Sequence, residues 1–293
     1  MVLETTRGHG VGLRRPASDR ACTCSSRWQV WLEIDALRPW LRRDRLEGHT
    51  PPHGGLAEEG GFHLKTNSDA RKATTMSGVH NDTTLYGNAL RMLYILDAAG
   101  APVVGNPPVP TAIKVIDSQK RLSALHFWMR NPDHLVAALL LKVEAGDRSL
   151  LDTVKQILDD REPELRRVPM QRYLRGAWEP VDTSMAVLVT NGLAYYERVK
   201  AHPDEKTLKH VYYLLRAGKD LAARMTKDEP ELDWYRQRAE LVATIAPEAT
   251  GSGLKDLQYL VPEYARAKMG APIGSIADRV RREYARVAAE YGT

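Results

Sequence analysis

The chain has 293 residues, of which 42 are Lys or Arg and 37 are Asp or Glu, and its sequence pI is near 9.1. Hydrophobic residues make up 43%, which is enough to build a core and excludes wholesale disorder. Two cysteines exclude a disulfide-rich scaffold, and we expect a reducing, cytoplasmic compartment. The sequence has no apolar run of about 18 residues, which excludes an ordinary transmembrane helix. The basic balance is compatible with nucleic-acid binding, so the distribution of charge matters.

Composition changes near residue 76. Residues 1–75 hold 8 of the 21 glycines, both cysteines and three of the five net positive charges. We predict that they form a disordered or mis-assigned N-terminal extension and that Met76 is the true start. From Met76 onward the chain has 30 basic and 28 acidic residues. This net charge of +2 is too small to indicate nucleic-acid binding by itself.

Helical periodicity begins after Met76. Thr83 or Thr84 is predicted to cap a helix that ends at Gly100, and the proline-rich segment 101–110 is predicted to be a loop. Asn131–Pro132 ends one helix and starts another, because Asn caps and Pro fits the first helical position. We predict helices over residues 85–99, 111–130, 132–143 and 150–158.

The segment from Arg166 to Lys200 indicates the fold. It is predicted to form a short helix over 166–175, a turn over 176–180 and a helix over 182–191 with Met185, Leu188 and Val189 inside. Gly192 then supplies a left-handed C-cap, and Leu193–Val199 has strand character. A helix followed by glycine, leucine and a short strand is typical of the last helix and wing of a winged helix-turn-helix.

The last third is predicted to be helical. Helices are expected over residues 204–225, 231–246, 254–268 with a kink at Pro262, and 273–291 with Ser275 or Gly274 as cap. The fold prediction is therefore mainly α, with a winged helix-turn-helix-like domain over 76–200 and a helical bundle or extension over 201–293.

Two segments carry a family resemblance. RLSALHFWMRNPDHLVAALL (121–140) and YLRGAWEPVDTSMAVLVTNGLAYYE (173–197) resemble the small winged-helix accessory proteins, the middle components, of bacterial ABC-three-component systems. The resemblance spans residues 85–199. It implies a winged-helix fold and an accessory role in antiviral defence or stress, and it transfers no active-site residue.

Several candidate chemical sites have a structural alternative that we favour. Cys22, Cys24 and His9 are too few for a closed zinc site, which takes four ligands, so no metal and no cofactor is predicted. His202 and His210 are two helical turns apart and are expected on a solvated face. The glycines at 251–253 and the segment 103–110 lack the context of a phosphate loop and are expected to be linkers.

A second candidate cluster lies at the Asn131–Pro132 break. His126, Asp133 and His134 could supply a general base, which requires a histidine next to a carboxylate. The alternative is a partly buried interface histidine with an aspartate that favours the helix dipole. Catalysis requires a particular geometry between the histidines and the carboxylate, and the sequence does not give that geometry. We therefore favour the structural alternative and predict no enzyme activity.

Arginines near the predicted wing are the candidate phosphate ligands. The predicted recognition helix, 182–191, contains no Lys or Arg, which argues against base reading. The alternative role for the arginines is a solvated helix face that pairs with Glu162 and Glu164. The candidate phosphate-binding residues are Arg166, Arg167, Arg172, Arg175, Arg198 and Lys200, and the candidate interface tyrosines are Tyr259, Tyr264, Tyr284 and Tyr291.

Two functions follow from these observations. The first is a non-catalytic interaction or accessory subunit of a bacterial multi-protein system, with a protein partner or a second copy as ligand. The second is a DNA-binding transcriptional regulator that dimerises through its C-terminal helices.

Overall fold

The computed structural model describes residues 78–173, 176–178, 181–200, 209–245 and 251–291. Within these ranges the protein is mostly helical with a small antiparallel sheet, which confirms a mainly α protein. The predicted extension over 1–75 and its boundary at Met76 lie outside the described residues.

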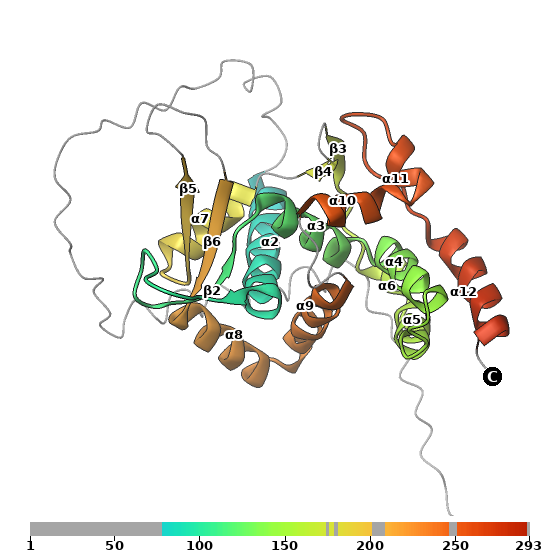
Figure 1. Ribbon diagram of the computed structural model, residues 1–293, viewed down its shortest axis with the longest axis horizontal. Coiled ribbons are helices and arrows are strands. Elements are labelled where there is room, and N and C mark those ends of the chain that lie inside the picture. The colour runs from blue at the N-terminus through green and yellow to red at the C-terminus, as the bar shows by residue number, and fades with distance from the viewer. Residues whose placement is uncertain (1–77, 174–175, 179–180, 201–208, 246–250, 292–293) are drawn as a thin grey trace, which may run out of the picture.

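A long helix and a sheet form one end of the molecule (Figure 1). In α2 (Gly78–Ala99) every residue from 87 to 96 is buried. The sheet contains, in spatial order, β1 (Ala101–Pro102), β2 (Ala112–Ile116), β6 (Lys209–Leu215) and β5 (Ala194–Val199), and all neighbours are antiparallel. The sheet contacts α2, α3 (Gln119–Arg130) and α7 (Val181–Thr190).

The other end of the molecule is a group of helices (Figure 1). It contains α4 (Pro132–Glu144), α5 (Leu150–Asp159), α6 (Glu162–Leu165), α11 (Pro262–Arg266) and α12 (Ala277–Tyr291), together with the short strands β3 (Gln171–Tyr173) and β4 (Gly176–Trp178). The remaining elements are α8 (Arg216–Asp228), the short η2 (Pro230–Leu232), α9 (Asp233–Ile245) and α10 (Gly251–Tyr259).

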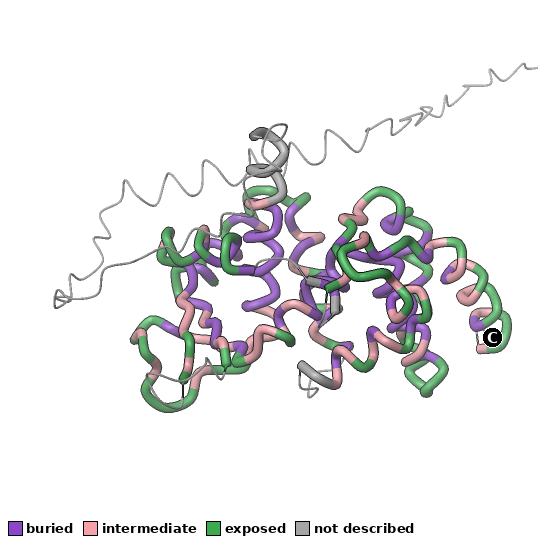
Figure 2. Tube along the Cα trace, turned by 90° about the horizontal axis from the view of Figure 1, so that it is seen from above, coloured by how far each residue is buried: buried purple, intermediate pink, exposed green. Residues whose placement is uncertain are grey.

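One hydrophobic core joins the two ends. α9 packs on α2 and α3, and α10 packs on α3, so helices late in the chain contact helices early in it. Buried residues run along the centre of the molecule from the sheet to α12 (Figure 2). The predicted domain boundary at residue 200 lies between β5 and β6, and six residues of β5 pair with β6.

Two predicted helices each contain a strand followed by a helix. Residues 111–130 form β2 and then α3, and the described part of 204–225 forms β6 and then the start of α8. The prediction of continuous helices was wrong because AIKVI and KHVYYLL are rich in β-branched and aromatic residues that pair with each other across the sheet. Tertiary pairing outweighs the helical spacing of their leucines and valines.

The segment 166–180 also differs from its prediction. Where a helix over 166–175 and a turn over 176–180 were predicted, residues 171–173 and 176–178 form the β3–β4 pair. The other edge of β3 is also bonded, because Arg172 N donates to Ala271 O (2.9 Å) and Gly270 N donates to Arg172 O. Extended backbone is stable here since its polar groups find partners on both sides.

Several helix ends lie close to their predicted positions. Asn131–Pro132 separates α3 from α4 with Pro at the first helical position, as predicted, but the Asn131 side chain donates to Phe127 O (2.9 Å) instead of capping α4. Gly192 has a φ of +67°, which confirms the left-handed C-cap of α7.

Other helix ends were predicted wrongly. α2 begins at Gly78, before Thr83 and Thr84, and Pro262 starts α11 as a separate helix instead of kinking a longer one. α12 begins at Ala277, and the Ser275 hydroxyl accepts from Ala277 N (3.3 Å), as a cap residue does. Val189, predicted on the inner face of α7, is exposed.

Candidate functional site

Arg167 is engaged inside the protein. Its Nε lies 3.3 Å from Asp133 Oδ2, and its Nη2 donates to Ile273 O, so it ties α4 to the segment that precedes α12. The Arg167 side chain is 12% exposed and that of Asp133 is fully buried. A guanidinium in this position serves an internal carboxylate and cannot also reach a phosphate.

Arg172 lies among aromatic rings of α10 and α11. Its Nη2 donates to the Tyr259 hydroxyl, and its guanidinium carbon lies 4.8 Å from the Tyr259 ring centre and 5.5 Å from that of Tyr264. Tyr264 is fully buried, accepts from Ala177 N (2.6 Å) and donates to Gln258 Oε1 (3.0 Å). Burial raises the pKa of Tyr264 to about 12. Tyr264 is therefore a core residue, and its prediction as an interface residue was wrong.

The remaining predicted phosphate ligands do not converge. Arg166 lies over the Trp234 ring at 4.4 Å, whereas Arg198 Nε donates to the Tyr196 hydroxyl (2.8 Å) on β5. Lys200 ends the described part of this strand region, and Arg175 lies outside the described residues. The four predicted arginines that the structure describes consequently have four different sets of contacts.

Two of the predicted interface tyrosines lie on α12. Tyr284 and Tyr291 are partly buried against the core, and Arg148 lies 5.1 Å from the Tyr291 ring. Tyr259, on α10, is likewise partly buried. These rings hold helices together, and part of each remains accessible to solvent.

Asp133 and His134 of the histidine and aspartate cluster bind the segment that precedes α12. Asp133 Oδ2 accepts from the Ser275 hydroxyl (2.9 Å) and from Ile276 N (2.8 Å), so its carboxylate anchors the start of α12. His134 Nε2 is 3.2 Å from Gly274 O, and burial lowers the pKa of His134. The Asp133 oxygen that accepts from the Ser275 hydroxyl also binds Ile276 N and lies beside the Arg167 guanidinium, so these contacts serve packing.

His126 is fully buried on α3. Burial, then the positive charges of Arg130 and Arg91, lower the pKa of His126 well below its usual range. Its two ring nitrogens have no hydrogen-bond partner among the described residues. His126 is therefore a neutral core histidine, remote from solvent. His210 lies on β6 with Nδ1 bonded to the Tyr196 hydroxyl, and His202, Cys22, Cys24 and His9 lie outside the described residues.

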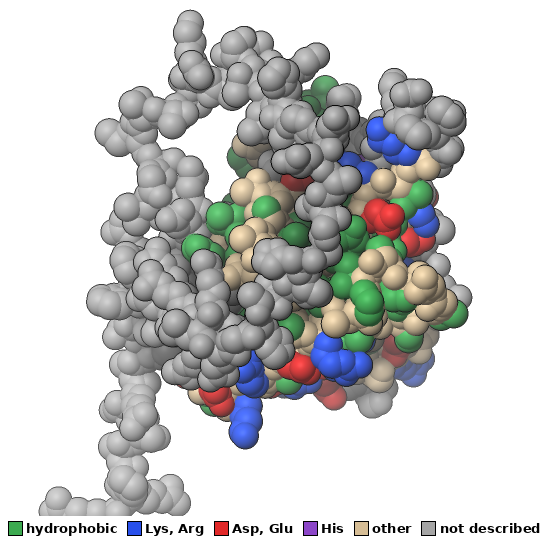
Figure 3. Space-filling model, turned by 90° about the vertical axis from the view of Figure 1, so that its left-hand side faces the viewer, with side chains coloured by type: hydrophobic (Ala, Val, Ile, Leu, Met, Phe, Trp, Pro, Cys, Tyr) green, Lys and Arg blue, Asp and Glu red, His purple; other side chains and the backbone are tan. Residues whose placement is uncertain are grey.

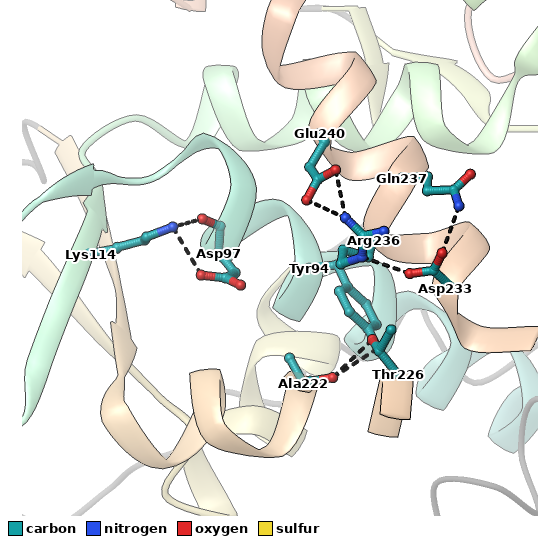
Figure 4. A network of polar contacts seen from close by, with 9 residues as sticks. All are labelled: Tyr94, Asp97, Lys114, Ala222, Thr226, Asp233, Arg236, Gln237 and Glu240. Atoms are coloured by element: carbon teal, nitrogen blue, oxygen red, sulfur yellow. Dashed lines mark hydrogen bonds and ion pairs between the residues drawn. The ribbon is translucent and has the colours of Figure 1, made fainter. Parts of the chain in front are cut away.

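A polar pocket of about 270 Å³ lies between α2, β2, α8 and α9. Figure 4 shows its ion pairs, in which Lys114 Nζ lies 2.9 Å from Asp97 Oδ1 and Arg236 binds Asp233 (2.6 Å) and Glu240 (2.8 Å). The hydrogen bond from Arg236 lowers the pKa of Asp233. This pocket could not be predicted from the sequence, because the residues that line it are spread from Tyr94 to Glu240, about half of the chain.

The tyrosine that lines the pocket also has hydrogen-bond partners. Tyr94 lies 2.9 Å from the Thr226 hydroxyl and donates to Ala222 O (3.3 Å), and burial raises its pKa (Figure 4). Among the nine residues drawn, every charged side chain has an opposite charge beside it. The Lys114–Asp97 ion pair therefore joins β2 to α2, the hydrogen bonds of Tyr94 join α2 to α8, and the Arg236 pairs lie within α9. Among the nine residues drawn, this arrangement brings no nucleophile next to a base.

The exposed side of α7 is uncharged except at its start. Its exposed residues are Asp182, Thr183, Ala186, Val189 and Thr190. Hydrophobic and uncharged side chains cover much of the visible surface on the side of the molecule that carries β5 (Figure 3). A face of this kind suits contact with protein better than contact with phosphates.

The comparisons with known proteins give no family. The chain matches no known protein family, no curated protein and no solved structure. In the part of the chain that the structure describes, no helix combines the length and apolar character needed to cross a bilayer. In the same residues, no three His, Cys, Asp or Glu side chains gather as metal ligands would.

Proposed function

We propose that this chain is a non-catalytic interaction subunit built on a winged helix-turn-helix-like core. The order α2, β2, α3, α7, β5, β6, with β6 between β2 and β5, supports this fold. In this interpretation α4 to α6 and the β3–β4 pair are an insertion between the second and third helices, and α7 takes the place of the recognition helix.

The exposed face of α7 carries the functional proposal. A helix that reads DNA presents Arg, Lys, Asn or Gln to base edges, and phosphate contacts need cations nearby. Ala186 and Val189 form the middle of the exposed face, and Asp182 at its start would repel a phosphate backbone. Arg167 and Arg172, which a DNA-binding role would require, already have partners within the chain: Arg167 pairs with the buried Asp133, and Arg172 donates to the Tyr259 hydroxyl.

A bacterial accessory role is consistent with these features. The resemblance to middle components of ABC-three-component systems concerns structural segments, and α7 lies inside one of them. A protein partner that packs on Ala186 and Val189 would bury small apolar side chains without leaving a charge unpaired.

A paired substitution tests the proposal. Ala186→Arg adds a cation to the exposed face of α7, and Gln156→Arg adds the same cation to an exposed position on α5. In affinity purification from the native host, we expect the wild type and Gln156→Arg to retain the same partner and Ala186→Arg to lose it. In gel shifts, we expect wild type to give no shift at low salt. A salt-sensitive shift with wild type, or a partner that Ala186→Arg retains, would overturn the proposal.

A further inference from the structure

The sheet has a second face, opposite the one that shares a core with α2, α3 and α7. Side chains alternate between faces along a strand. On β5 and β6, Ala194, Tyr212 and Leu214 belong to the hydrophobic core that α2, α3 and α7 share. Tyr195, Val211 and Tyr213, which alternate with them, lie outside that core. The two tyrosines are partly exposed, whereas Val211 is 3% exposed. The tyrosines therefore belong to the opposite face, called the outer face below.

One row of uncharged side chains crosses the outer face from edge to edge. Ala101 on β1 lies opposite Val115 on β2, Val115 lies opposite Tyr213 on β6, and Tyr213 lies opposite Tyr195 on β5. Residues opposite one another in a ladder share a face, so all four project to the same side. The two tyrosine rings are 6.1 Å apart. Across the sheet the row therefore changes from small side chains to large ones.

A charged pair borders the row. Lys209 precedes Tyr213 by four residues on β6, and Asp117 follows Val115 by two residues, just after β2. Because side chains alternate between faces, both belong to the outer face. Their charged atoms are 3.5 Å apart, and the side chains are 49% and 67% exposed. Because both side chains are exposed, the lysine of this pair can contact the aspartate of an identical pair, and its aspartate can contact the lysine of that pair.

We propose that a second copy of this chain covers the outer face. A two-fold axis parallel to the strands would lay β6 of one copy over β2 of the other, and β5 over β1. Tyr213 would then meet Val115 of the second copy, and Tyr195 would meet its Ala101, so each large side chain packs on a small one. The same rotation brings Lys209 over Asp117 of the second copy. Shape and charge both match under one symmetry operation, as a two-fold interface requires.

The remaining charge of this face lies at its rim. Glu197 is on β5, the edge strand, and its Oε2 accepts from the Tyr213 hydroxyl at 3.5 Å. A rim carboxylate stays hydrated when the centre of the face is buried. This dimer leaves α7 exposed, so it does not depend on the function proposed above.

The mass of the full chain in solution tests the proposal. The monomer mass is 32.8 kDa. By light scattering after size exclusion, we expect wild type to have twice that mass. We expect Tyr213→Arg to weaken the dimer by about tenfold or more, because it places a charge at the centre of the interface. Tyr173→Arg, the same substitution at a 50% exposed tyrosine on β3, is the matched control and should leave the dimer intact.

Two further measurements keep the test independent of folding defects in Tyr213→Arg. Lys209→Asp should weaken the dimer, and adding Asp117→Lys should restore it. In a Cys22→Ser, Cys24→Ser background, Tyr195→Cys with Ala101→Cys should give a disulfide-linked dimer under oxidation. Within one copy these positions are three strand spacings, about 14 Å, apart and cannot form a disulfide. A wild-type chain that stays monomeric at high micromolar concentration, or a dimer indifferent to all these changes, would overturn the proposal.

Discussion

Asp133 joins the start of α12 to α4, so removing its carboxylate should release the C-terminal helix. In Asp133→Ala, the Arg167 guanidinium, with a side chain only 12% exposed, loses its ion-pair partner 3.3 Å away. The Ser275 hydroxyl and Ile276 N lose the oxygen to which they donate at 2.9 and 2.8 Å. Leaving a buried charge without its partner costs about 3–5 kcal/mol, and we expect a loss of this size in the free energy of unfolding.

Urea unfolding followed by circular dichroism measures this loss. A loss of about 3–5 kcal/mol is a large part of the 5–15 kcal/mol that stabilises a typical domain, so the midpoint should fall steeply. Hydrogen exchange should rise first in residues 273–276 and the first turn of α12, because those backbone groups lose their anchor. Asp133→Asn keeps an acceptor oxygen without the charge, so its loss should be smaller.

An exposed ion pair on the same helix is the control. Glu290 pairs with Arg286 on α12, and their side chains are 51% and 54% exposed. Glu290→Ala should cost about 0–1 kcal/mol, since exposed pairs contribute little. If Asp133→Ala also cost no more than about 1 kcal/mol, the buried carboxylate would not anchor α12, and the reasoning would be refuted.

Two other predictions concern single buried positions. The pKa of His126 is depressed in the folded chain, so protons bind the unfolded state better. Stability should be fully present above the unfolded value of about 6.5 and decline as the pH falls below it. Chemical denaturation from pH 7.5 to 5 should show this slope in wild type, and a slope unchanged in His126→Leu would contradict it. In Gly218→Ala the new Cβ would lie 2.2 Å from Leu193 O, so backbone must move at a cost of about 1–3 kcal/mol. Gly274→Ala meets no atom within 4 Å and should unfold at nearly the wild-type urea concentration; equal midpoints for the two variants would disprove the clash.

Features that depend on neighbouring residues were predictable from the sequence. Pro132 cannot continue a helix because it lacks the N–H, and Gly192 accepts a positive φ that other residues resist. The ends of α3 and α7 follow from these local properties. The strand β5 also followed, because its aromatic and β-branched residues come directly after such a helix end.

The roles of the candidate phosphate-binding arginines were predicted less well, because their contacts are with residues far away in the sequence. Arg167 and Arg172 were proposed as phosphate ligands from their closeness in sequence. Their partners Ile273 and Tyr259 come about a hundred residues later. The uncharged face of α7 was visible in the sequence, since it follows from the residue types of one helix.

The sequence by itself determined where helices begin and end at Pro132 and Gly192, the uncharged character of α7 and the predominance of helix. Only the tertiary structure decided that β2 is a strand and that β6 is the central strand beside it, because a strand is stable only beside a partner, and these two partners lie about a hundred residues apart. The other partner of β6 is β5, which is close to it in the sequence. The tertiary structure also decided that Asp133 is an internal anchor, since burial and distant donors fix the role of a carboxylate.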